Sequence, residues 1–125
     1  MQTPIEIRTT IHLSGTTYQI EDNFKRLLES KFIEQEQLGL VTILYKTKYN
    51  NIENGPVRLF FTNGTAVYLN LTAGYDGNGP HTTCNILSMF NIPGFNEDDI
   101  LLPQEVVNIC YKLKKDIDFV CSSGV

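Results

Sequence analysis

Residues 57–71 read VRLFFTNGTAVYLNL and give the clearest fold signal in the chain. Two runs rich in β-branched and aromatic residues flank Asn63-Gly64, a dipeptide typical of a two-residue β-hairpin turn of the primed type. Such a turn would pair Thr62 with Thr65, Phe60 with Val67, and Leu59 with Tyr68. Both faces of this hairpin are partly apolar, so we expect it to lie centrally in its sheet with each face at least partly covered.

The chain before the hairpin predicts a strand, a helix and a second strand. Residues 5–13 alternate apolar and polar side chains, which is the pattern of a half-buried strand, and His12 falls on the exposed face. A helix is predicted from about residue 18 to residue 34, because apolar residues recur at helical spacing. They are Ile20, Phe24, Leu27, Leu28 and Phe32. Residues 40–49 are again β-branched and aromatic and predict a strand, with Val41, Ile43 and Tyr45 on one face.

Two helices are predicted after the hairpin. The first follows residues 74–83, GYDGNGPHTT, with Thr82 or Thr83 as its cap, and ends near Pro93. The second opens at Pro103. Its apolar stripe consists of Val106, Ile109, Cys110, Leu113 and Ile117. The resulting order over residues 1–125, β-α-β-β-β-α-α, predicts a single α+β domain in which about three helices pack on a mostly antiparallel sheet of about four strands.

The composition predicts a soluble protein with an acidic surface. The 125 residues include 14 Asp and Glu against 10 Lys and Arg, which gives a formal net charge of −4. Nucleic-acid binders usually carry a basic face, so direct DNA or RNA binding is disfavoured and a basic protein partner is permitted. No stretch is apolar enough to span a bilayer, and the start MQTPIEIRTT is not a signal peptide, so we expect a cytoplasmic location.

The stretch GYDGNGPHTT has the glycine spacing of a phosphate-binding loop at Gly74 and Gly79. Pro80 stands where that loop requires lysine, and His81 stands where it requires a hydroxyl residue. Because proline supplies neither charge nor a backbone N–H, we expect no nucleotide here. The simpler interpretation is a turn into a helix, in which Gly77 and Gly79 provide conformational freedom and Pro80 stiffens the approach. A carboxylate of a partner could lie at this helix N-terminus.

The three cysteines, Cys84, Cys110 and Cys121, have unrelated spacings, so we expect reduced, buried thiols. A metal site would need His81 and Cys84 to share a helix face and to gain further ligands from the other cysteines or His12. We predict no metal, because closed sites normally have paired ligands. An enzymatic alternative places Cys84 in a first helical turn, where the dipole lowers a thiol pKa, with His81 as its base. No third, orienting group is present, so we predict no catalytic residue and no cofactor.

Glu97, Asp98 and Asp99 form the densest acidic run in the chain. Three interpretations are open: a solvated loop, acids that begin the following helix, or a surface presented to a basic partner. Calcium is not expected, because the segment lacks the alternating ligands, the central glycine and the closing glutamate of a calcium loop.

The chain resembles the small immunity proteins that bacteria encode beside polymorphic or contact-dependent growth inhibition toxins. The resemblance rests on a short, acidic, Asn-rich α+β profile without a catalytic set, and on the turn Gly77-Asn-Gly-Pro80 that leads into a helix bearing Ile86-Leu87. It implies a non-enzymatic protein that binds and blocks a cognate toxin. Alternatives are a small enzyme or ligand-binding domain that uses the His81–Cys84 turn, and an interaction subunit of another bacterial complex.

A toxin of the nuclease type needs a basic cleft for phosphates, and carboxylates would complement such a cleft. We therefore expect Glu97, Asp98 and Asp99 at the toxin interface, with Asp76 as a further candidate.

Overall fold

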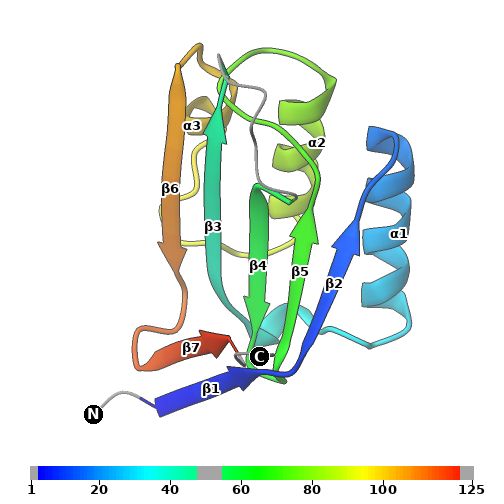
Figure 1. Cartoon of the computed structure of the whole chain (residues 1–125), viewed down its shortest axis with the longest axis vertical. Coiled ribbons are helices and arrows are strands. Elements are labelled where there is room, and N and C mark those ends of the chain that lie inside the picture. The colour runs from blue at the N-terminus through cyan, green and yellow to red at the C-terminus, as the bar shows by residue number, and fades with distance from the viewer. Residues whose placement is uncertain (1–2, 48–54, 122–125) are drawn as a thin grey trace.

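A computed structural model describes residues 3–47 and 55–121 of the chain (Figure 1). The strands are β1 (Thr3–Ile7), β2 (Thr9–Leu13), β3 (Leu38–Lys46), β4 (Val57–Phe61), β5 (Thr65–Leu69), β6 (Val106–Lys112) and β7 (Ile117–Cys121). The helices are α1 (Thr17–Glu29), α2 (Asn78–Leu87) and α3 (Asp98–Leu101), and a 3-10 turn, η1 (Gln35–Gln37), precedes β3.

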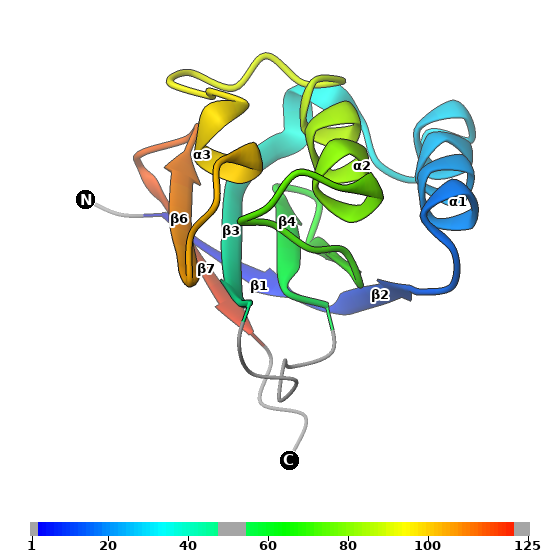
Figure 2. The ribbon, with the colours of Figure 1, turned by 90° about the horizontal axis from the view of Figure 1, so that it is seen from above.

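The architecture is α+β with three helices, as the sequence predicts, but the described residues form seven strands rather than about four, and the element order differs from β-α-β-β-β-α-α. Five strands form one mixed sheet in the order β2-β5-β4-β3-β6, and β1 pairs with β7 in a second, two-stranded sheet. The pairs β3–β4, β3–β6 and β4–β5 are antiparallel, whereas β2–β5 and β1–β7 are parallel. Figure 2 shows all three helices on the same side of the main sheet.

The main core lies between this sheet and the helices. Val41 and Ile43 of β3 are fully buried, and Tyr45 of the same face is partly buried, as the alternation in residues 40–49 predicts. Ile20 and Phe24 of α1 are also fully buried. The opposite face carries a second apolar cluster of Ile7, Phe60 and Ala66, against which Phe119 of β7 packs. The hairpin is therefore central and covered on both faces.

The predicted hairpin register is wrong by one residue. Leu59 lies opposite Val67, and Phe60 lies opposite Ala66. The loop contains three residues, 62–64, because the Gly64 N–H donates to the Phe61 carbonyl and only Gly64 takes a positive φ, +87°. A two-residue primed turn would need Asn63 to take a positive φ as well. Since side chains alternate along a strand, this one-residue difference brings Leu59 and Val67 together on the helix side of the sheet.

The predicted strand over residues 5–13 is two strands in two different sheets. The chain changes sheet at Arg8, where the Arg8 and Thr9 N–H groups both donate to the Gly64 carbonyl, at 2.8 and 3.2 Å. The tip of the β4–β5 hairpin therefore holds the junction between β1 and β2. Alternation of side chains continues across this junction, so it carries no sign of the break.

The first helix ends five residues earlier than predicted. Thr16 caps α1 through a reciprocal pair of hydrogen bonds with Gln19, which is a capping box. Ser30 follows the last turn, and Lys31 takes a left-handed conformation with φ +61°. The Phe32 N–H then donates to the Leu27 carbonyl, so the chain leaves the helix in a C-terminal capping turn.

The predicted last helix, from Pro103, is wrong. Residues 106–121 form β6 and β7, and β6 pairs along its whole length with β3. Burial alternates in this segment, with Val107 and Tyr111 buried and Val106 and Lys112 exposed. The residues of the helical stripe do not share one face of the strand, since Val106 and Cys110 are exposed, whereas Val107, Ile109 and Tyr111 recur at a two-residue period. The β-branched residues at 106, 107 and 109 favour the strand.

Candidate functional site

The loop between β5 and α2 contains the glycine-rich stretch. Gly77 is the N-cap residue of α2, and Pro80 is buried in the first turn. Neither predicted cap is correct: Thr82 and Thr83 are buried inside the helix. The Thr83 hydroxyl donates to the Thr72 carbonyl at 2.9 Å and so fastens the helix to the preceding loop.

The glycines of this loop leave space for two side chains, Thr72 and Tyr75. A Cβ atom at residue 77 would lie 2.7 Å from Cε2 of Tyr75, and one at residue 79 would lie 2.0 Å from Oγ1 of Thr72. Gly74 has φ +89°, and its Cβ would meet the Gln104 carbonyl at 3.0 Å. The spacing that resembles a phosphate-binding loop is therefore explained by close packing.

Tyr75 forms one wall of a pocket of about 630 Å³ at the end of the sheet where β3 ends and β6 begins. Tyr45 of β3 faces it, with the two ring centroids 6.5 Å apart and the ring planes tilted by 43°. The other lining residues are Thr47, Gly74, Pro103, Gln104 and Glu105. Burial is the larger cause that raises the pKa of Tyr45, and the neighbouring Tyr75 raises it further, so the Tyr45 phenol is neutral at physiological pH.

Hydrogen bonds join the three segments that build this pocket. The Thr47 hydroxyl donates to the Gln104 carbonyl at 3.0 Å, and the Gln104 N–H donates to the Gly74 carbonyl at 3.0 Å. The Tyr75 and Thr72 hydroxyls lie 2.7 Å apart. These bonds hold the pocket walls in a fixed arrangement before any ligand arrives.

The predicted site residue His81 contacts Asp76. His81 Nε2 lies 2.6 Å from Asp76 Oδ1, and both side chains are mostly exposed. The pair closes the loop that carries Gly77 and Gly79, at the start of α2.

Glu97, Asp98 and Asp99 are exposed and lie at the beginning of α3. One alternative, that these acids begin a helix, matches the structure, but the helix is the short α3. The Asp99 backbone carbonyl accepts a hydrogen bond from the Gln104 side chain at 2.9 Å, which joins α3 to the rim of the tyrosine pocket. Hydrogen bonds thus join the glycine-rich loop, α3 and residues 103–105, the segments that carry Asp76, Asp99 and Glu105.

The chemical environment of Cys84 differs from the predicted one. Cys84 lies in the second turn of α2, is 3% exposed, and makes no hydrogen bond with His81. Burial, the larger cause, and the nearby Glu97 carboxylate together raise the pKa of the Cys84 thiol to about 11. The alternative of a thiol in the first helical turn with a lowered pKa therefore does not match the structure. The prediction of buried cysteines is correct for Cys84 and wrong for Cys110 and Cys121, which are exposed.

Tyr111 of β6 packs beside α3. Its hydroxyl is buried and has no hydrogen-bond partner of normal geometry among the described residues. Burial, followed by the nearby Asp99 carboxyl group, raises the pKa of Tyr111. Phe95 lies edge-on to its ring, with 6.0 Å between the centroids.

A row of polar and aromatic side chains crosses the sheet on the face away from the helices, and the sequence analysis did not predict it. The strand register places in this row Cys110, Thr42, Arg58, Tyr68 and His12. The Arg58 guanidinium lies 4.1 Å from the Tyr68 ring centroid, and the His12 ring meets the same ring edge-on at 5.1 Å. The exposed position of His12 is as predicted, but its neighbours depend on strand order, which no local pattern reveals.

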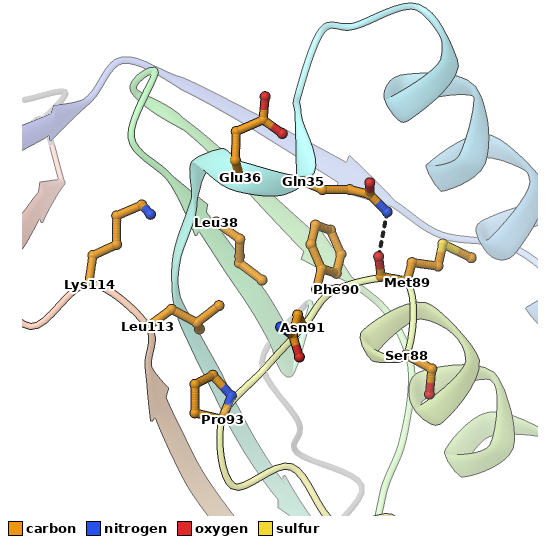
Figure 3. Close-up of a pocket in the computed structure, with 10 residues that line it drawn as sticks. All are labelled: Gln35, Glu36, Leu38, Ser88, Met89, Phe90, Asn91, Pro93, Leu113 and Lys114. Atoms are coloured by element: carbon orange, nitrogen blue, oxygen red, sulfur yellow. Dashed lines mark hydrogen bonds between the residues drawn. The ribbon is translucent and has the colours of Figure 1, made fainter.

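A second pocket, of about 680 Å³, lies at the other end of the sheet, between η1, the segment after α2 and the β6–β7 connection (Figure 3). Leu38, Phe90 and Leu113 form its apolar wall, and Glu36 and Lys114 lie on its rim. The Gln35 amide bridges η1 to the Met89 carbonyl. This pocket combines one acid with one base, so it has no net preference for either charge.

Within residues 3–47 and 55–121, no group of three or more His, Cys, Asp or Glu side chains is arranged to hold a metal ion. None of the described helices has the length and apolar character needed to cross a membrane. Comparison of the chain with protein-family models, with curated proteins and with solved structures found no match.

Proposed function

We propose that this protein is a non-enzymatic immunity protein that binds a basic, nuclease-type toxin domain and blocks it. One observation carries the proposal: no lysine or arginine occurs between Arg58 and Lys112, whereas five acids do. They are Asp76, Glu97, Asp98, Asp99 and Glu105. This segment supplies α2, α3 and the loops that carry Tyr75 and Gln104, so these parts of the molecule present carboxylates, while Lys46 of β3 lies at the same end of the sheet, opposite Val106.

An acidic surface of this kind suits a partner that itself binds nucleic acid. Enzymes that cleave DNA or RNA hold phosphates through lysine and arginine side chains, and an inhibitor can complement those side chains with carboxylates. The acids of α3 and of the neighbouring loops are carried by elements hydrogen-bonded to one another and packed on a sheet, which suits a binding surface. The protonated state of the buried Cys84 thiol also favours a role without nucleophilic chemistry at this turn.

The experiment compares two triple charge reversals. Glu97, Asp98 and Asp99 are replaced together by lysine; in the control, the exposed acids Glu29, Asp116 and Asp118 are replaced in the same way. Glu29 ends α1, Asp118 lies in β7, and Figure 1 shows the end of α1 and β7 at the opposite end of the sheet from α3. Both variants change the net charge equally. The proposal predicts a large reading frame next to the gene, and the toxin to be tested is the C-terminal domain that this frame encodes.

We expect the first variant to lose protection of cells that express the toxin, while the control variant protects. Melting temperatures establish that both variants are folded. Full protection by the Glu97, Asp98 and Asp99 variant would contradict the proposed interface. The absence of any protection by the unaltered protein against the neighbouring toxin would contradict the proposed function.

A further inference from the structure

We propose that the pocket between Tyr45 and Tyr75 binds the guanidinium group of an arginine side chain. The proposed function supplies the source of that arginine, a basic toxin domain, and the inference therefore deepens it. The pocket itself is argued from its own geometry and charge.

The two tyrosine rings suit a planar cation. A cation is attracted to the face of an aromatic ring when it lies within about 6 Å of the centroid. The two centroids are 6.5 Å apart and both rings line the pocket, so a cation in the pocket can lie within reach of both rings. Arginine fits better than lysine, since the guanidinium is planar, stacks on aromatic faces and is more weakly hydrated.

The charge of the pocket also favours a cation. Among the seven lining residues the one charged residue is an acid, Glu105, and no lining residue is basic. The loop that carries Tyr75 continues into Asp76, and the Gln104 side chain that lines the pocket is hydrogen-bonded to the backbone of Asp99. The pocket therefore adjoins both Asp76 and the acidic helix α3.

The walls are held in place without a ligand. Gly77 and Gly79 leave the space in which Tyr75 and Thr72 lie, and the two hydroxyls of those residues are 2.7 Å apart. Thr47 binds the backbone of both Gln104 and Glu105 through its hydroxyl, at 3.0 and 3.2 Å. Binding would therefore cost little ordering of the pocket, and this favours affinity for a small group.

The test uses a blocked arginine, acetyl-arginine amide, and its neutral isostere, acetyl-citrulline amide, with the full chain labelled for NMR. We expect arginine to shift the amide signals of Thr47, Tyr75 and Gln104 saturably, with a dissociation constant on the order of millimolar. Citrulline should cause no saturable shift. Removing one ring with Tyr45→Leu should weaken arginine binding by about fivefold or more, whereas Tyr45→Phe, which keeps the ring, should retain it.

Tyr75→Leu provides a second variant at a more exposed position, in case Tyr45→Leu does not fold. Equal shifts with citrulline, or undiminished arginine binding by a folded ring-removal variant, would overturn the pocket proposal. That result is separable from the proposed function: the toxin could still depend on Glu97, Asp98 and Asp99. Conversely, arginine binding with full toxin protection by the charge-reversal variant would support the pocket and contradict the proposed interface.

Discussion

Gly77 leaves the space that the ring of Tyr75 fills, because a Cβ atom at residue 77 would lie 2.7 Å from Cε2 of that ring. Gly79 stands in the same relation to Thr72, whose Oγ1 would lie 2.0 Å from an added Cβ. The side chains of Tyr75 and Thr72 are hydrogen-bonded to each other, so both glycines support one contact at the edge of the tyrosine pocket.

Gly79→Ala should lower the free energy of unfolding by about 1–3 kcal/mol, the usual cost of overpacking. Gly77→Ala should cost less, because the Tyr75 ring can move outward, but it should displace that ring and weaken binding of the blocked arginine. Urea denaturation measures the first effect and NMR titration the second. Asn78→Ala is the control, since Asn78 is exposed between the two glycines. A Gly79→Ala protein as stable as the control would contradict the packing role.

Tyr111→Phe should leave the free energy of unfolding unchanged or raise it by up to about 1 kcal/mol, because the buried hydroxyl has no hydrogen bond of normal geometry to lose. Tyr75→Phe is the matched comparison. It removes a hydroxyl bonded to Thr72 and should cost about 0.5–1 kcal/mol. A larger loss in Tyr111→Phe than in Tyr75→Phe would show that the Tyr111 hydroxyl has a partner in solution, with Asp99 the nearest candidate.

The raised pKa of Cys84 makes stability depend on pH. In the unfolded chain the thiol titrates near its ordinary value of 9.0, and in the folded protein near about 11. Below the lower value both states keep the proton, so the thiol has no effect. Between these two pKa values the unfolded chain loses a proton that the folded protein retains. The free energy of unfolding therefore falls by up to about 1.4 kcal/mol for each pH unit.

Urea midpoints measured between about pH 8 and about pH 10 test this, with Cys84→Ala as the comparison. The variant should be less stable at the lower pH, because it leaves a cavity, and its stability should fall less steeply as the pH rises. Parallel curves for the two proteins would show that Cys84 does not carry the dependence.

The sequence predicts an element correctly where the local pattern of side chains matches the position of that element in the folded protein. The alternation of Val41 and Ile43 marks a strand in any sheet, and the Asn63-Gly64 turn marks a hairpin. The last helix was mispredicted because Val106, Ile109 and Leu113 fit a helical stripe, while pairing with β3 is decided by residues sixty or more positions away. The hairpin register depended on one backbone angle, the positive φ of Gly64, which allows a three-residue loop as well as a two-residue one.

The glycine-rich stretch was visible in the sequence as an unusual loop, but its purpose was not. Tyr45 and Tyr75 come from separate elements and meet only because Thr47 and Gly74 both bind the backbone at Gln104. The row from Cys110 to His12 depends likewise on the order of five strands. The run Glu97-Asp98-Asp99 and the absence of lysine and arginine between Arg58 and Lys112 are the sequence signals for this acidic segment, and Figure 1 shows that α3 and the start of α2 lie at the same end of the sheet.

Salt should act mainly on the rate at which the toxin domain associates. Long-range attraction between the acidic end and a basic cleft speeds encounter, and it is screened within about 10 Å at 0.1 M salt and about 3 Å at 1 M. Contacts already formed at short range are screened less, so the dissociation rate should change less than the association rate. Surface plasmon resonance at these two salt concentrations separates the two rates.

The variant with lysine at 97, 98 and 99 should associate slowly at low salt and lose most of the salt dependence, whereas the variant with lysine at 29, 116 and 118 should keep it. Equal salt dependence in the two variants would place the electrostatic contact elsewhere on the protein, and the exposed face of β1 and β2 around Glu6 and His12 would be the next surface to change.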